Sequence, residues 1–198
     1  MEILNESYWT NRYQQEKTGW HAGAITTPLK TYIDQLSDKN IKILIPGSGN
    51  SYEAAYLFER SFANVFIVDI SKHPLERFKQ EYPTFPNGQI LHQDFFDLEE
   101  QFDLIIEQTF FCALDPKLRP AYAQKMHELL KPGGRLVGLL FDAPLYQDHL
   151  PFGGNRQEYR PYFEPYFHFH IFETSYNSIP PRQGMELFID LQKKDNKG

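Results

Sequence analysis

Short apolar runs alternate with amphipathic segments over the first two thirds of the chain. The apolar runs predict strands over residues 41–46, 65–69, 89–92, 101–108 and 135–141. The segments between them predict helices over residues 51–60, 72–81 and 117–130. This alternation is typical of an α/β fold, in which a mostly parallel sheet carries helices on both of its faces.

Two further helices are predicted before the first strand, where polar residues are interrupted by spaced aromatic side chains. The first covers residues 6–16 and the second covers residues 28–36. Thr27 is expected to cap the second helix, because a hydroxyl side chain can accept a hydrogen bond from a free backbone N–H. Pro28 suits the first helical position, where its missing N–H costs nothing.

The pattern changes after Phe141. Residues 142–165 are rich in Pro, Gly and aromatic side chains, and predict a long surface loop that leads into a short helix. Residues 168–176 and 184–194 then predict two strands that pair with one another across a long hairpin loop. The whole pattern predicts seven strands, the last two of which form an antiparallel pair.

The most informative motif is the run Ile-Leu-Ile-Pro-Gly-Ser-Gly at positions 43–49. It predicts a buried strand that ends in a glycine turn, and Asp69 follows Gly49 at the end of the next strand. This arrangement suits a nucleoside cofactor, because bare backbone faces the ligand while a carboxylate reaches its ribose. The dinucleotide motif G-x-G-x-x-G requires a third glycine, where this chain has Tyr52. A ligand without a pyrophosphate, such as S-adenosylmethionine, is therefore favoured.

Composition narrows the class of protein. The chain has 198 residues, which suits a single domain over residues 1–198, and 16% of them are aromatic. The net charge of −6 and the absence of a Lys/Arg run argue against nucleic acid as a partner. No apolar run approaches the roughly 20 residues that cross a bilayer. Cys112 is the single cysteine, so an internal disulfide is impossible, and we expect a cytoplasmic monomer or weak homodimer.

Several longer segments, in this order, resemble the thiopurine S-methyltransferase superfamily and, within it, the plant-type thiol and halide methyltransferases. They are YWTNRYQQEKTGWHAG, ILIPGSGNSYEA, VDIS, QDFFDL, FCALDPKLRPAYAQKMHELLKPGGRL and SIPPRQG. The resemblance runs from Trp9 to Lys193. It implies a Rossmann-like class I methyltransferase that binds S-adenosylmethionine, with residues 1–36 forming a lid over this cofactor.

The resemblance assigns cofactor contacts to several residues. Trp9, Tyr13 and Trp20 would contact the cofactor from the lid, where aromatic faces attract the sulfonium cation; the alternative is an ordinary core stripe. The backbone at Gly47 and Gly49 would approach the methionine part. The other contacts are Asp69 to the ribose, Asp94 to the adenine amino group and Phe95 against the adenine ring, although Phe95 could also be core.

Two residues at the end of the fourth strand remain open. Gln108 matches an arginine that touches the cofactor in mammalian thiopurine enzymes, so that contact is uncertain in this chain. Glu107 is either a further cofactor contact or a buried acid that supports the following loop. Both positions lie where open α/β sheets bind their ligands.

The methyl acceptor is expected beyond these residues. Its candidate contacts are Phe110, Phe111, Tyr122, Tyr146, Phe152 and Arg182, with His21 as a further possibility from the lid. Cys112 is expected to be structural, because no base accompanies it. His168 and His170 alternate on a predicted strand but lack a third ligand, so no metal is expected.

The expected reaction is an in-line transfer of the methyl group to a small thiol, hydrosulfide or halide-like anion. No catalytic residue is assigned, because an acceptor that is already anionic needs no general base. Three alternatives stay open. The acceptor could be a thiopurine-like heterocycle or a metalloid oxyanion, the protein could be a nicotinamide-dependent oxidoreductase, or it could bind the cofactor without catalysis.

Overall fold

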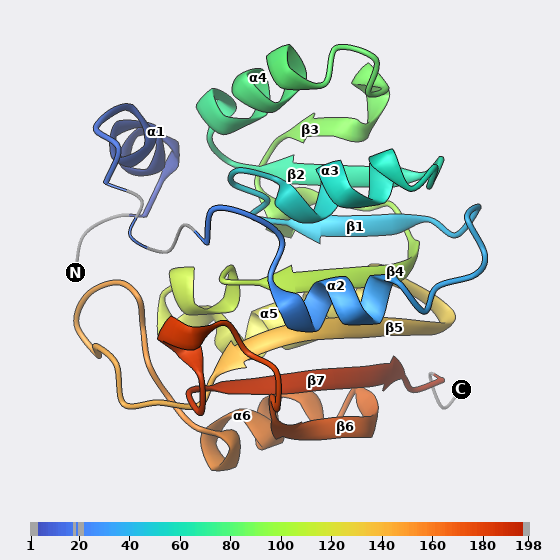
Figure 1. The fold of residues 1–198 in the computed structure, drawn as a ribbon. Helices are drawn as coiled ribbons and strands as arrows, with labels where there is room; N and C mark the ends of the chain where they lie inside the picture. Colours follow the sequence, from blue (N-terminus) through green and yellow to red (C-terminus); the bar gives the residue numbers. More distant parts are fainter. Residues whose placement is uncertain (1–3, 18, 20–21, 196–198) are drawn as a thin grey trace.

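A computed structural model describes residues 4–17, 19 and 22–195. One sheet of seven strands has the order β3-β2-β1-β4-β5-β7-β6 (Figure 1). The strands are β1 (Ile43–Pro46), β2 (Val65–Asp69), β3 (Ile90–His92), β4 (Phe102–Gln108), β5 (Leu130–Phe141), β6 (Phe167–Thr174) and β7 (Glu186–Lys193). Neighbouring strands from β3 to β5 are parallel, whereas β7 runs antiparallel to both β5 and β6. The predicted α/β fold with its C-terminal antiparallel pair is confirmed.

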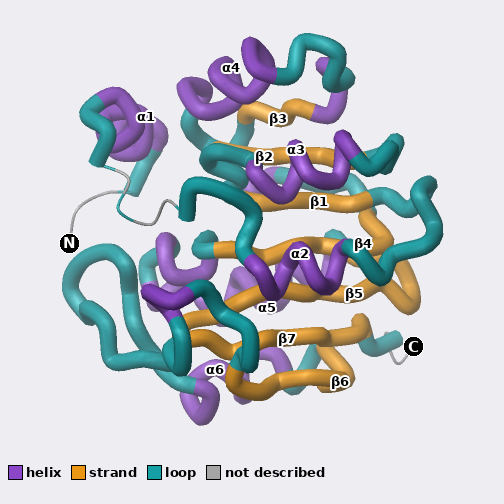
Figure 2. Tube along the Cα trace, in the orientation of Figure 1, coloured by secondary structure: helices purple, strands orange, loops and turns teal. Residues whose placement is uncertain are grey.

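Helices cover both faces of this sheet (Figures 1 and 2). The covering helices are α2 (Thr27–Ile33), α3 (Tyr52–Glu59), α4 (Lys72–Glu81), α5 (Arg119–Glu128) and α6 (Arg156–Phe163), and a further helix is α1 (Glu6–Gln14). Short 3₁₀ turns link several of them: η1 (Asn87–Gln89), η2 (Phe95–Asp97), η3 (Phe111–Ala113), η4 (Pro116–Leu118) and η5 (Pro180–Arg182). No helix in the described ranges is long and apolar enough to cross a membrane.

The sheet separates two apolar cores. On one face, α2, α3 and α4 bury side chains such as Leu29, Leu57 and Phe78 against the first strands. On the other face, α5 and α6 bury side chains such as Met126 and Phe163. Because strands that are covered on both faces must be apolar throughout, the near-continuous Val, Ile and Leu runs of β1, β2 and β4 follow from this packing.

Two predicted boundaries were wrong by more than fraying at the ends. The N-cap of α2 is Thr26 instead of Thr27, so Pro28 takes the second helical position, and the Thr26 hydroxyl makes no capping hydrogen bond because it donates to Gln108. Strand β5 begins at Leu130 and not at 135, because the chain turns into the sheet directly after α5. Gly133 adopts φ +74° within this strand, and the register against β4 shifts there.

The carboxyl ends of β1, β2, β3 and β4 all point to one edge of the sheet, as parallel strands require (Figure 1). Helix α1 stands beside this edge, apart from the two covering layers. The loop of residues 142–155 returns to the same edge from the opposite side. These two segments therefore flank the place where an open α/β sheet binds its ligand.

Candidate active site

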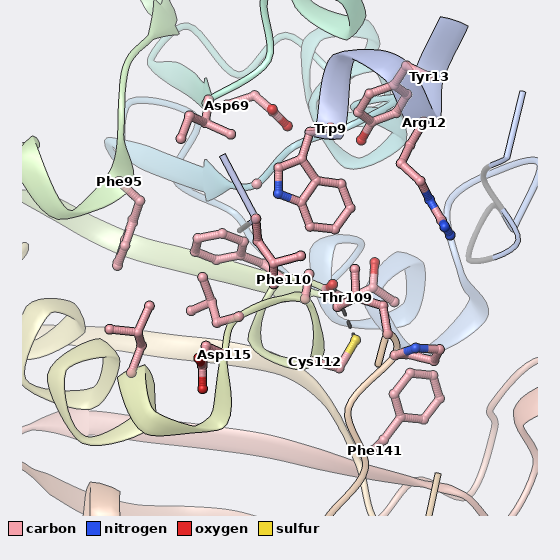
Figure 3. Close-up of a pocket in the computed structure, with 18 of the residues that line it drawn as sticks. Trp9, Arg12, Tyr13, Asp69, Phe95, Thr109, Phe110, Cys112, Asp115 and Phe141 are labelled. Atoms are coloured by element: carbon pink, nitrogen blue, oxygen red, sulfur yellow. Dashed lines mark hydrogen bonds between the residues drawn. The ribbon is translucent and has the colours of Figure 1, made fainter. Parts of the chain in front are cut away.

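A cavity of about 850 Å³ opens at the carboxyl edge of the strands, between α1 and the 142–155 loop (Figure 3). We call its two parts the acidic end and the apolar end. The acidic end comprises Asp69, Asp94 and Phe95, which follow strands β2 and β3. The apolar end comprises Cys112, Phe141, Pro181 and Met185. Phe110 and Trp9 lie between the two parts in Figure 3.

The glycine turn after β1 is shaped by close neighbours. Gly47 and Gly49 have φ angles of +56° and +49°, a region that residues with a Cβ rarely adopt. A Cβ on Gly47 would come within 2.2 Å of Cδ2 of Phe110, and a Cβ on Gly49 within 2.8 Å of the hydroxyl oxygen of Tyr13. Both glycines are thus required for geometry as well as for space. Gly47 lines the cavity, whereas Gly49 is buried and does not, so its predicted approach to the cofactor stays a prediction.

Asp69 ties this turn to the end of β2. Its Oδ2 accepts a hydrogen bond from the backbone N–H of Gly49 at 3.0 Å, and its Oδ1 accepts one from Ser71 at 2.8 Å. Burial raises the pKa of Asp69 to about 6, and the two backbone hydrogen bonds oppose that rise. Each carboxylate oxygen keeps a second lone pair, so the ionised group can also accept from hydroxyls in the cavity.

The turn after β3 completes the acidic end. Asp94 caps the 3₁₀ turn η2, and its Oδ1 accepts from the backbone N–H of Phe96 at 2.9 Å. Phe95 is almost completely buried and meets Phe110 edge to face, with ring centroids 5.2 Å apart. A flat apolar group in this part of the cavity would have an aromatic wall and a carboxylate beside it.

Glu107 lies behind the cavity wall and not on it. Its Oε1 accepts from the backbone N–H groups of Phe110 at 2.7 Å and Phe111 at 3.0 Å, and its Oε2 accepts from the hydroxyl of Tyr122. Burial raises the pKa of Glu107 to about 7, although these three bonds lower it. The acid fixes the turn after β4, in which Thr109 has φ +59°. This position corresponds to the supporting role that the sequence left open.

Gln108 is also turned away from the cavity. Its Oε1 accepts from the hydroxyl of Thr26 at 2.9 Å, which links β4 to the start of α2. Its Nε2 is buried and makes no hydrogen bond within the part of the chain that the structure describes. The predicted cofactor contact of Gln108 therefore has no support from the lining of the cavity, and it stays a prediction.

Helix α1 presents one face to the cavity. Trp9, Arg12 and Tyr13 all line it, as the spacing of three and four residues on a helix allows. Side-chain contacts that hold the helix include Thr10 Oγ1 to Ser71 Oγ and Glu6 Oε1 to His92 Nε2, each at 2.9 Å. Trp20 and His21, two further expected contacts, lie outside the described residues.

The six predicted acceptor contacts are divided by the structure. Phe110 and Arg182 line the cavity. Phe111, Tyr122 and Phe152 are buried in the core beside it and do not line it.

Tyr146 is half-exposed and lines a separate hollow of about 490 Å³ beside the 142–155 loop. Its ring stacks on that of His149. Whether any of the six predicted residues contacts an acceptor stays a prediction.

Sequence reasoning missed several residues that line the cavity. They are Arg12, Thr109, Leu114, Phe141, Leu145, Pro181 and Met185. Arg12 could have been found, because it lies three residues after Trp9 on the same helix face. Phe141 ends β5 and Pro181 lies in η5, while the others come from irregular segments after β4, β5 and η5, where no periodicity shows which side chains turn inward.

Cys112 lines the apolar end with its thiol hydrogen-bonded to the carbonyl of Thr109 at 3.3 Å (Figure 3). Burial raises the pKa of this thiol to about 12, and the nearby Glu107 adds to the rise. Within the described ranges, no three His, Cys, Asp or Glu side chains lie close enough together to hold a metal ion.

A glycine turn, a buried carboxylate at the end of β2 and aromatic side chains on α1 meet at this cavity, an arrangement that suits an adenosyl ligand. The sequence model of the family described as Thiopurine S-methyltransferase (TPMT) matches residues 4–187. The chain belongs to this family. Members transfer methyl groups from S-adenosylmethionine, so the protein is an S-adenosylmethionine-dependent methyltransferase. The alternatives of a nicotinamide-dependent oxidoreductase and of a binding module without catalysis are set aside.

Relatives within and beyond the family agree with this conclusion. The chain is 34% identical over 185 residues to probable thiol methyltransferase 2 of Arabidopsis thaliana, covering 90% of this chain and 81% of the relative. It is 29% identical to thiocyanate methyltransferase 1 of Arabidopsis thaliana, over 93% and 84% of the two chains. The fold also matches the Burkholderia thailandensis 1,6-didemethyltoxoflavin-N1-methyltransferase, solved with S-adenosylhomocysteine, with a TM-score of 0.75 at 18% identity over 96% and 87% of the chains.

Proposed function

We propose that this methyltransferase acts on a small soft nucleophile, namely a thiol, hydrosulfide or halide-like anion. The observation that carries the proposal is the composition of the apolar end. Its lining is aliphatic, aromatic and sulfur-bearing, and no histidine lines the cavity within the described residues. The thiol and thiocyanate methyltransferase names of the two plant relatives support the same class of acceptor.

The acidic end fits the cofactor. Asp69 would accept hydrogen bonds from the ribose hydroxyls, while Asp94 and Phe95 would hold the adenine. The backbone at Gly47, which lines the cavity, would approach the methionine part, and Gly49 would hold the same turn in shape. S-adenosylmethionine supplies, when bound, an electrophilic methyl group on a positively charged sulfur. Trp9 and Tyr13 offer that cation aromatic faces from the lid.

The apolar end would favour the reaction by keeping water out. Attack of an anion on a sulfonium consumes both charges, and water stabilises separated charges more than it stabilises the transition state. Side chains such as Phe110, Phe141 and Met185 therefore lower the barrier by excluding water. A thiol with a pKa near 8.5 is a few per cent ionised at neutral pH, which makes a dedicated base unnecessary.

We also propose a domain organisation, an oligomeric state and a location for the protein. Residues 1–198 form one domain that functions as a monomer or weak homodimer in the cytoplasm. A chain with a single, buried cysteine suits a reducing compartment. Sedimentation at increasing concentration tests the oligomeric state, and a stable dimer or tetramer at low micromolar concentration would contradict it.

The acceptor class can be tested directly. Purified protein is incubated with S-adenosylmethionine and, separately, with iodide, thiocyanate, hydrosulfide, benzenethiol and 6-mercaptopurine. Methylated products are measured by gas or liquid chromatography, with the Asp69→Ala variant as the inactive control. We expect transfer to the soft anions and to the simple thiols. If calorimetry shows binding of S-adenosylhomocysteine but only 6-mercaptopurine is methylated, the proposed acceptor class is wrong.

A further inference from the structure

Arg12 lines the cavity but has no part in the proposed cofactor site. It lies on α1 between Trp9 and Tyr13, and all three residues line the cavity. In Figure 3 the Arg12 guanidinium lies on the opposite side of Trp9 from Phe95. Arg12 therefore extends away from the acidic end, where the adenosyl group is expected.

The charges around the cavity suggest what the Arg12 side chain does. The chain carries a net charge of −6, and Asp69, Asp94 and Asp115 line the cavity. An acceptor anion that approaches the cavity therefore meets a repulsive field, which slows its entry and weakens its binding. A positive side chain in the lining would weaken that repulsion and add to the attraction of the cofactor's sulfonium.

Two cations line the cavity within the described residues, Arg12 and Arg182. Arg182 is 8% exposed, and its Nη1 donates to Oε1 of the buried Glu186 at 3.4 Å. This ion pair fixes Arg182 in the wall of the cavity. Arg12 lies on the lid helix and is less deeply buried. A guanidinium is weakly hydrated, so it can exchange water for a soft anion at small cost.

We propose that Arg12 captures the anionic acceptor and sets the preference of the enzyme for anions over neutral nucleophiles. This inference rests on the proposed function, because it concerns the acceptor of that same site.

The kinetic test compares three variants with the wild type. Arg12→Gln should raise KM for iodide and thiocyanate about tenfold, with kcat and the Kd for S-adenosylhomocysteine changed less than twofold. Arg12→Lys should recover most of the loss. Arg160→Gln is the matched control, because it removes the same charge from the exposed side of α6 and should leave KM unchanged.

A binding test separates this inference from the proposed function. Iodide is titrated into the complex with S-adenosylhomocysteine while tryptophan fluorescence is recorded. Saturable quenching in the wild type, lost in Arg12→Gln and kept in Arg160→Gln, would support capture by Arg12 even if iodide is not methylated. Saturable quenching that survives in Arg12→Gln, or its absence in the wild type, would overturn the inference. A weaker Kd for S-adenosylhomocysteine with unchanged KM would instead assign Arg12 to the carboxylate of the cofactor.

Discussion

The acidic and apolar ends of the cavity are built in different ways. At the acidic end, Asp69 at the end of β2 accepts from Gly49 in the turn after β1 and from Ser71, and Asp94 and Phe95 follow β3, so each part lies directly at the end of a neighbouring parallel strand. At the apolar end, side chains come from η3, from the end of β5, from η5 and from the segment after η5, which are far apart along the chain. The parallel sheet alone therefore brings the acidic end together, whereas the apolar end depends on long-range packing between separate segments.

The 142–155 loop beside the apolar end is stabilised by hydrogen bonds from a side chain. This side chain is Arg119, a fully buried cation on α5. Its Nη1 donates to Glu158 Oε1 at 2.6 Å and its Nη2 to the carbonyl of Gly153 at 2.8 Å. The guanidinium also lies over the rings of Phe111 and Tyr159.

Because the acidic end is proposed to bind the cofactor and the apolar end the acceptor, a substitution at the acidic end should affect cofactor binding. A substitution at the apolar end should affect the acceptor alone.

The largest expected effect comes from Asp69→Ala. The substitution removes the predicted ribose contact and leaves the buried N–H groups of Gly49 and Ser71 without their acceptor. We expect the Kd for S-adenosylhomocysteine to rise by about 100-fold or more, which equals about 3 kcal/mol. Calorimetry measures this loss, and circular dichroism verifies that the variant is folded. An unchanged Kd would remove Asp69 from the cofactor site.

Gly47→Ala should follow in size. The added methyl group would collide with the Phe110 ring at a backbone angle that disfavours alanine, so the glycine turn must shift. We expect a loss of about 1–3 kcal/mol in the free energy of unfolding and of about 30-fold in kcat/KM. Gly88→Ala is the matched control, since nothing lies within 4 Å of its added Cβ. Equal behaviour of the two variants in thermal unfolding and in kinetics would refute this account.

A smaller effect should separate two adjacent phenylalanines. Phe110 lines the cavity, whereas Phe111 packs in the core against Tyr122 and Tyr159. Phe110→Leu should lower kcat/KM for a thiol about tenfold with little change in the unfolding midpoint. Phe111→Leu should lower the free energy of unfolding by about 1–2 kcal/mol with kcat/KM nearly unchanged. The reverse outcome would show that the cavity wall has been assigned to the wrong ring.

The smallest expected effect is that of pH on cofactor binding. The raised pKa of Asp69, about 6, means that the free enzyme protonates this group as the pH falls below 7. Only the ionised form can accept from all its donors, so the affinity for S-adenosylhomocysteine should be constant above pH 7. It should then fall about twofold at pH 6 and about tenfold at pH 5. Calorimetry across this range tests the prediction, and a flat profile would contradict it. Asp69→Asn should bind weakly at every pH.

The same contrast explains what could be predicted from the sequence. The strands, the glycine turn and Asp69 follow from local periodicity and from one motif, because neighbouring strand ends meet by geometry. Phe110 and Phe111 are adjacent and chemically identical, and only the turn held by Glu107 decides which ring faces the cavity. Met185 and Pro181 reach the site through long-range packing, which leaves no local pattern in the sequence.

Cys112 has a consequence for the lifetime of the enzyme. An enzyme that methylates sulfur can also methylate a cysteine thiol that lines its own active site, as Cys112 does. With a pKa of about 12, only about one Cys112 thiol in 10⁵ is ionised at pH 7. The Cys112 thiol is therefore a far poorer nucleophile than an acceptor that enters as an anion. The burial of Cys112 thus protects the enzyme from methylating itself over repeated turnovers.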